Sequence, residues 1–104
     1  MTSKGEASIN TNCPAEHLLK TVSGRWKPAI VRYAVNEPVR FSILLRQLNG
    51  ITRQSLAAAL KELHTEDILE KVVLRQKPLH IEYKLTEKGE MLAGVLLQLE
   101  RLTK

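Results

Sequence analysis

The spacing of apolar residues changes twice along this chain, and no other feature constrains its fold as strongly. Up to about residue 66, apolar residues recur every three to four positions, which places them on one face of an α-helix. Between residues 69 and 85 the pattern changes to the alternation that is typical of β-strands. After residue 86 the helical spacing returns. The chain is therefore predicted to be mainly α-helical with one small β-hairpin.

Four helices are predicted before the alternating segment, because residues that start or end helices flank each apolar stripe. Pro14 suits the first turn of a helix, and Pro38 cannot continue one. Ser42, after a short extended segment over residues 39–41, and Thr52 are expected to be N-caps. The predicted helices cover residues 14–22, 26–34, 42–48 and 52–66, and the short turn Asn49-Gly50-Ile51 joins the last two.

Two strands and one more helix complete the expected fold. The strands are predicted over residues 69–74 and 81–85, with residues 75–79 as their polar connection. Thr86 is the expected N-cap of a last helix, which runs to Leu102. Two helices joined by a short turn and followed by a hairpin form a winged helix-turn-helix. In such a unit the second helix of the pair enters the major groove of DNA.

The size and composition of the chain allow one domain. With 104 residues, 43% of them hydrophobic, the chain can bury a single core. We expect a flexible polar arm over residues 1–12 and one folded domain over residues 13–104. The arm lacks the apolar stretch of a signal peptide, and the apolar runs fall far short of the roughly 20 residues that cross a membrane. The protein is therefore expected to be cytoplasmic and to have no membrane partner.

The charge balance favours a polyanionic partner and the motifs disfavour catalysis. Sixteen Lys and Arg residues against eleven Asp and Glu residues give a net charge of +5, which suits double-stranded DNA. The chain has no nucleophile with a base, no paired carboxylates and no phosphate-binding glycine loop. His17, His64 and His80 fall on three different elements, away from any cysteine at metal-ligand spacing. We predict no enzyme activity, no metal, no cofactor and no identifiable small-molecule ligand.

The residues expected to contact DNA lie around the predicted helix-turn-helix and on the wing. Arginine pairs with guanine and glutamine with adenine, which makes Arg53 and Gln54 the predicted base readers, while Ala58 could touch a thymine methyl group. Cations beside these elements are expected to contact phosphates, which position a protein without selecting a sequence. The predicted DNA-binding residues are Arg40, Thr52, Arg53, Gln54, Ser55, Ala58, Arg75 and Lys77, with Arg46 and Lys71 as weaker candidates.

The same helix allows an alternative function. The run Ala57 to Ala59 leaves a smooth surface that could pack against a protein. The alternative hypothesis is therefore a winged-helix protein-interaction module with weak or no specific DNA binding. The two functions differ in salt dependence. The logarithm of the association constant for DNA falls with the logarithm of the salt concentration, with a slope of about −0.9 per neutralised phosphate, whereas binding to a protein would show little salt dependence.

The last predicted helix indicates a homodimer. Its apolar residues cover more than the roughly 100° stripe that a helix on a monomer needs, so a second copy is expected to bury the excess. A twofold dimer would present two reading helices about 34 Å apart and would recognise an inverted repeat. The predicted interface joins the first and last helices through Leu18, Leu19, Leu92, Val95, Leu96, Leu99 and Leu102.

Cys13 is the only cysteine of the chain and has two interpretations. It directly precedes Pro14 at a helix start, where free backbone N–H groups and the helix dipole stabilise a thiolate, so it is the redox candidate. A lone cysteine is also commonly an inert, buried small side chain. Without a second cysteine in the chain, oxidation of Cys13 would have to join it to another subunit or to a small thiol.

The chain resembles the HxlR-type family of bacterial winged helix-turn-helix transcription regulators from about Cys13 to Leu102. The resemblance implies a dimer built on the terminal helices, DNA as the partner, and a regulatory cysteine in some members. The reading helix departs from the family, because Ala57, Ala58 and Ala59 stand where polar or basic residues are usual. The stretches that carry the resemblance are Cys13-Pro14, Ser23-Gly24-Arg25-Trp26, Arg40-Phe41-Ser42, Gly50-Ile51-Thr52, Glu82-Tyr83 and Leu85-Thr86-Glu87-Lys88-Gly89.

Overall fold

Helices and one antiparallel hairpin make up the part of the chain that this computed structural model describes, residues 14 to 103. The predicted arm over residues 1–12 and the redox candidate Cys13 lie outside the described residues. The expected fold class, mainly α with a small β-hairpin wing, is confirmed. The elements are α1 (Pro14–Val22), α2 (Lys27–Ala34), α3 (Phe41–Gln47), α4 (Arg53–Thr65), β2 (Leu69–Gln76), β3 (Leu79–Leu85) and α5 (Glu87–Leu102).

The core is built around α4. Leu56, Leu60 and Leu63 follow one another at spacings of four and three residues, so they share one face of the helix, and all three are buried. They belong to one apolar cluster with Ile30 of α2 and Leu44 of α3. Burying a side chain of this size contributes about 1.5 to 3 kcal/mol. Because this stripe faces the core, the opposite face of α4 is left at the surface.

Two predicted N-caps are confirmed. The Oγ1 atom of Thr52 accepts a hydrogen bond of 3.0 Å from the backbone N–H of Ser55 in α4. The Oγ1 atom of Thr86 accepts one of 2.9 Å from the backbone N–H of Gly89 in α5. Each cap supplies a partner for a backbone donor that the first turn of a helix leaves unpaired.

Helix α3 begins one residue earlier than predicted, so Ser42 is not its N-cap. The helix starts at Phe41, and Arg40 occupies the cap position without a side-chain hydrogen bond. The cause lies just upstream, because Val39 and Tyr83 of β3 exchange two backbone hydrogen bonds of 2.8 Å. The chain leaves this short bridge at Arg40, and the half-buried Phe41 then packs against the core. The predicted extended segment therefore ends before Phe41.

The hairpin is longer than predicted. Residues 75–79 were expected to be a connection, but β2 runs to Gln76, β3 begins at Leu79, and these two residues pair. Only Lys77 and Pro78 remain as the turn. Backbone hydrogen bonds can extend a hairpin beyond the residues whose side chains alternate, so the apolar spacing underestimates its length.

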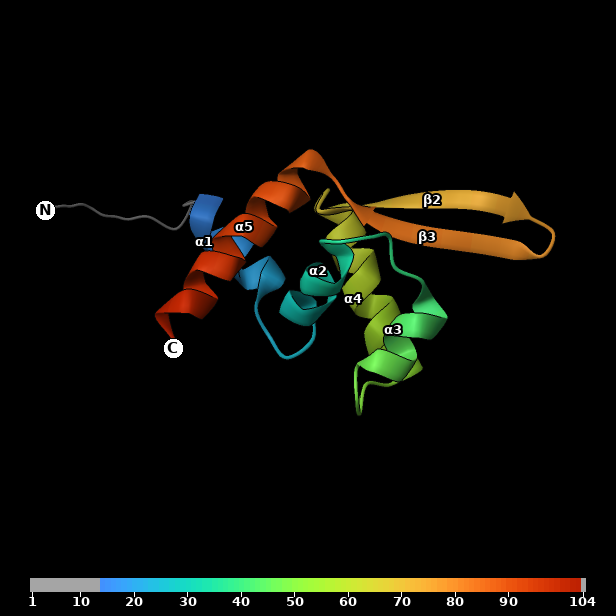
Figure 1. Ribbon diagram of the computed structural model, residues 1–104, viewed down its shortest axis with the longest axis horizontal. Helices are drawn as coiled ribbons and strands as arrows, with labels where there is room; N and C mark the ends of the chain where they lie inside the picture. The colour runs from blue at the N-terminus through green and yellow to red at the C-terminus, as the bar shows by residue number, and fades with distance from the viewer. Residues whose placement is uncertain (1–13, 104) are drawn as a thin grey trace, which may run out of the picture.

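The hairpin and the terminal helices lie at opposite ends of the molecule. Figure 1 shows β2 and β3 projecting from the helical body, with α3 and α4 nearer to them and with α1 and the C-terminal half of α5 at the other end. No helix in residues 14–103 is long and apolar enough to span a membrane. The arrangement separates the predicted DNA-binding parts from the predicted dimer surface.

Candidate nucleic-acid interface

Helices α3 and α4 form a helix-turn-helix whose turn is anchored in the core. Gly50 has a φ of 94°, a conformation that glycine adopts without a steric penalty. On either side of it, Leu48 and Ile51 are buried, and the Ile51 N–H donates a hydrogen bond of 3.1 Å to the Leu48 carbonyl oxygen. The turn therefore holds the start of α4 in a defined position relative to α3.

The first turn of α4 presents polar side chains to solvent. Arg53, Gln54 and Ser55 are all exposed, and they follow directly on the Thr52 cap. Leu56, the next residue, is fully buried and fixes the rotation of the helix. One helical side thus carries the predicted base readers while the other is held by the core, which is the geometry that a reading helix requires.

The wing and the start of α3 carry the remaining predicted contacts. Arg75 near the end of β2 and Lys77 in the turn are exposed, as are Arg40 before α3 and Ala58 on the second turn of α4. These residues are distributed over the hairpin, the start of α3 and α4. A spread of this kind suits an extended partner such as a duplex, which contacts several elements at once.

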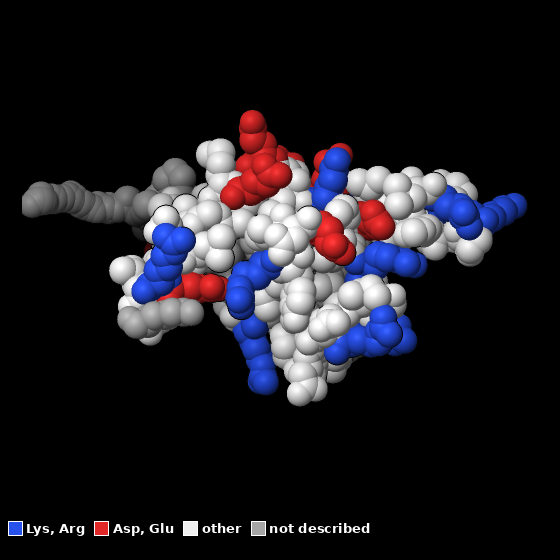
Figure 2. Space-filling model, in the orientation of Figure 1, with Lys and Arg blue, Asp and Glu red and all other residues white. Residues whose placement is uncertain are grey.

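Four cations predicted to contact DNA have no carboxylate partner among the described residues. Within residues 14–103, three cations face a carboxylate, in the pairs Lys27–Glu62, Arg32–Glu100 and, on the hairpin itself, Lys84–Glu70. Arg40, Arg53, Arg75 and Lys77 make no ion pair with any residue in the range 14–103. Figure 2 shows Lys and Arg at the tip of the hairpin, while a large group of Asp and Glu lies over the first half of α5. Positive charge is therefore available at the end where the helix-turn-helix and the wing lie.

The predicted dimer residues fall into two groups. Leu18, Leu92 and Leu96 are half-buried within the chain itself, and the last two pack against its own core. The other predicted residues of this surface are exposed, namely Leu19, Val95, Leu99 and Leu102. The exposed group leaves apolar surface uncovered at the end of the molecule away from the hairpin.

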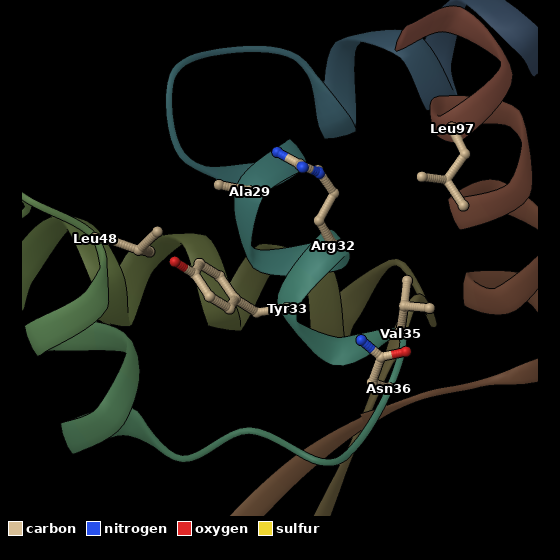
Figure 3. Close-up of a pocket in the computed structure, with 7 residues that line it drawn as sticks. All are labelled: Ala29, Arg32, Tyr33, Val35, Asn36, Leu48 and Leu97. Atoms are coloured by element: carbon tan, nitrogen blue, oxygen red, sulfur yellow. The ribbon is translucent and has the colours of Figure 1, made fainter. Parts of the chain in front are cut away.

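A separate hollow of about 550 Å³ crosses the surface of α2. Figure 3 shows Tyr33 pointing toward Leu48, at the end of α3, and Leu97 of α5 pointing toward α2 from the other side. The only cation among its lining residues, Arg32, is engaged by Glu100 through a 2.9 Å contact between Nε and Oε2. The hollow is thus mostly apolar, and its one positive charge is balanced.

Sequence reasoning missed two residues beside the reading surface, Lys61 and His64. Both lie on α4 and line a crevice between that helix and the hairpin. Lys61 follows Gln54 by seven positions, or about two helical turns, so the two side chains share one face. That spacing was visible in the sequence, but the meeting of α4 with the hairpin was not.

Comparison with known proteins identifies similar chains along most of the length. The model of the HxlR-like helix-turn-helix family matches residues 21–104. The uncharacterised HTH-type transcriptional regulator BH0655 of Halalkalibacterium halodurans is 33% identical over 97 residues, which cover 92% of this chain and 86% of that protein. The HTH-type transcriptional regulator YodB of Bacillus subtilis is 34% identical over 92 residues, covering 88% and 82%. The solved structure of the redox regulator HypR in its reduced form superimposes with a TM-score of 0.80 at 31% identity, covering 86% of this chain and 88% of that one.

Proposed function

Because the chain belongs to the HxlR-like helix-turn-helix family and is a DNA-binding transcription regulator, not an enzyme, we propose that it binds an inverted repeat in double-stranded DNA as a homodimer. In this proposal it acts in the bacterial cytoplasm, where α4 reads bases in the major groove and the hairpin contacts the adjacent backbone. The observation that carries the proposal is the first turn of α4, where Arg53, Gln54 and Ser55 are exposed beside a fully buried leucine.

Base reading is assigned to few side chains. Arg53 can donate two hydrogen bonds to a guanine and Gln54 can pair with an adenine, and each such contact contributes about 1 to 3 kcal/mol of discrimination. Ala58, one turn further along, is short enough to let the helix approach a thymine methyl group. Arg40, Arg75 and Lys77 contribute phosphate contacts that fix the position of α4 on the duplex.

The homodimer is supported by an apolar stripe on α5. Met91, Val95, Leu99 and Leu102 follow at spacings of four, four and three residues, and their exposed fractions lie between 45% and 80%. A stripe of this length on one helical face is covered when a second copy packs against it. With the pair of stripes at the twofold axis, the two α4 helices would reach successive major grooves about 34 Å apart.

A redox response through Cys13 is part of the proposal. The thiol directly precedes α1, and the similar protein HypR is a redox regulator. Oxidation would join two thiols, from two subunits or from one subunit and a small thiol, into a disulfide, with two electrons and two protons passing to the oxidant. If the thiol is instead inert, DNA affinity will be the same with reduced and with diamide-treated protein, and Cys13→Ser will have no effect.

The test is selection of duplexes from a randomised pool, followed by affinity measurements at two salt concentrations. We expect enrichment of an inverted repeat and binding that weakens with salt at about −0.9 per phosphate contacted. Arg53→Ala should lose about 1 to 3 kcal/mol on the selected duplex and relax its specificity. Arg101→Ala, on the last turn of α5, is the matched control and should bind as the wild type does.

The alternative protein-interaction function predicts the opposite results. Exposed Ala57 and Ala58 give α4 a smooth surface that could pack against another protein. If no sequence is enriched, and if the salt concentration hardly changes duplex binding, DNA recognition by α4 is refuted and a protein partner replaces it.

A further inference from the structure

The reading helix and the wing meet at a crevice of about 360 Å³. Its walls come from three parts of the chain, with α4 on one side, the hairpin on the other and α3 closing one edge. The lining residues are Phe41, Ala57, Leu60, Lys61, His64, Lys71 and Tyr83. The crevice thus lies where the two predicted DNA-binding elements come together.

The crevice holds positive charge without a carboxylate among its lining residues. Lys61 projects from α4 and Lys71 from β2, both are exposed, and neither makes an ion pair within residues 14–103. Glu37 and Glu82 line another hollow on the described surface, and Glu62 and Glu66 line a third, which Lys61 also borders without forming an ion pair. The charge in the crevice is therefore available to an anion from outside the chain.

The positions of the side chains are set by the fold. Lys71 pairs directly with Tyr83 in the antiparallel register, so both side chains lie on the same face of the hairpin. The Nδ1 atom of His64 lies 3.2 Å from the carbonyl oxygen of Leu69, and since a carbonyl oxygen only accepts, Nδ1 is the donor. This bond ties the end of α4 to the first residue of β2 and holds the two walls together.

The crevice also continues the reading surface. Gln54, Ala58 and Lys61 follow at spacings of four and three residues, so they lie along one exposed stripe of α4. A duplex whose bases face the start of this stripe has its sugar–phosphate backbone beside the later part. In such a complex, Lys61 would lie next to the backbone and Gln54 next to the bases.

We propose that this crevice seats a backbone phosphate of the bound DNA, with Lys61 on one wall and Lys71 on the other. The inference rests on the proposed DNA-binding function and adds to it a backbone contact between the reading helix and the wing. A lysine ammonium group is a compact charge on a flexible side chain, so it can approach a phosphate from several directions. The apolar atoms of Phe41 and Leu60 beside the two lysines reduce the screening of this attraction by solvent. Because every nucleotide carries the same phosphate, the contact adds affinity and fixes the position of α4 without selecting bases.

The experiment compares Lys61→Ala, Lys71→Ala and the control Lys84→Ala. Lys84 belongs to the same hairpin, next to Tyr83 in sequence and hence on its other face, where its Nζ atom lies 4.0 Å from Oε1 of Glu70. Binding of the selected operator duplex and of a scrambled duplex is measured over a range of salt concentrations. We expect each crevice variant to lose roughly five- to tenfold in affinity at about 0.1 M salt for both duplexes, and to lower the salt slope by about 0.9.

Two results would overturn the phosphate site while leaving the proposed function intact. In the first, the wild type binds its operator, but the crevice variants bind as tightly as Lys84→Ala does. In the second, the crevice variants weaken operator binding alone, which would indicate a base contact. Wild-type protein that binds neither duplex would refute the proposed function itself, and this inference with it. Lys61→Arg and Lys71→Arg keep the charge and should restore the salt slope, and circular dichroism checks that every variant is folded.

Discussion

At the scale of single residues, close packing leaves no room for a side chain at position 89, which is occupied by glycine. A Cβ atom at this position would lie 2.2 Å from the backbone carbonyl oxygen of Ile68, and a backbone atom cannot move aside cheaply. We expect Gly89→Ala to lower the free energy of unfolding by about 1 to 3 kcal/mol. Gly94, in the same helix, has open space around its Cβ position, so Gly94→Ala should be neutral or stabilising by up to about 1 kcal/mol. Urea unfolding at one protein concentration measures both, and equal stability of the two variants would contradict the close contact.

The same scale shows how much of the candidate site the sequence reveals. Arg53 and Gln54 were predicted as base readers because they follow a capping residue at the start of an amphipathic helix, and both are exposed. Lys61 was missed because its proposed role depends on Lys71, ten residues away on another element. The helical pattern alone reports which side of α4 faces solvent, but not what lies beside that side.

At the scale of elements, Thr86 controls the passage from the hairpin into α5. Its hydroxyl group accepts from the Gly89 N–H and donates to the carbonyl oxygen of Asp67 at 2.6 Å, so one side chain joins the start of α5 to the segment before β2. Thr86→Ala removes both bonds and should cost about 1 to 2 kcal/mol in the free energy of unfolding. Thr86→Ser keeps the hydroxyl group and should lose less than half of that. Thermal or urea unfolding of the two variants measures these changes in stability. Equal losses of unfolding free energy would show that the methyl group of Thr86, and not its capping hydroxyl group, provides the stabilisation.

At the scale of the whole molecule, the exposed stripe of α5 determines the oligomeric state in our proposal. Val95→Asp and Leu99→Asp place a charge in the stripe, which a dimer would have to bury without a partner, so we expect a monomer in sedimentation velocity. Leu97 has a similar exposed fraction, 44%, but lies on another side of the helix, and Leu97→Asp should remain dimeric. Dissociation of the dimer should weaken binding to the inverted repeat, because each monomer then binds its half-site independently and the gain from joining two binding sites is lost. A wild-type protein that sediments as a monomer would contradict the dimer.

The order of the elements and the class of the fold followed from the sequence alone, because hydrophobic spacing, proline stops and N-caps act within a few residues of one another. Thr52 and Thr86 are examples, since each cap bond spans three residues. Tertiary structure decided the rest. The start of α3 depends on the bridge between Val39 and Tyr83, the length of the hairpin depends on pairing across its strands, and the crevice exists only because α4 and β2 pack together. These features come from contacts between residues far apart in the chain, and a local pattern of apolar residues carries no record of which distant residues will meet.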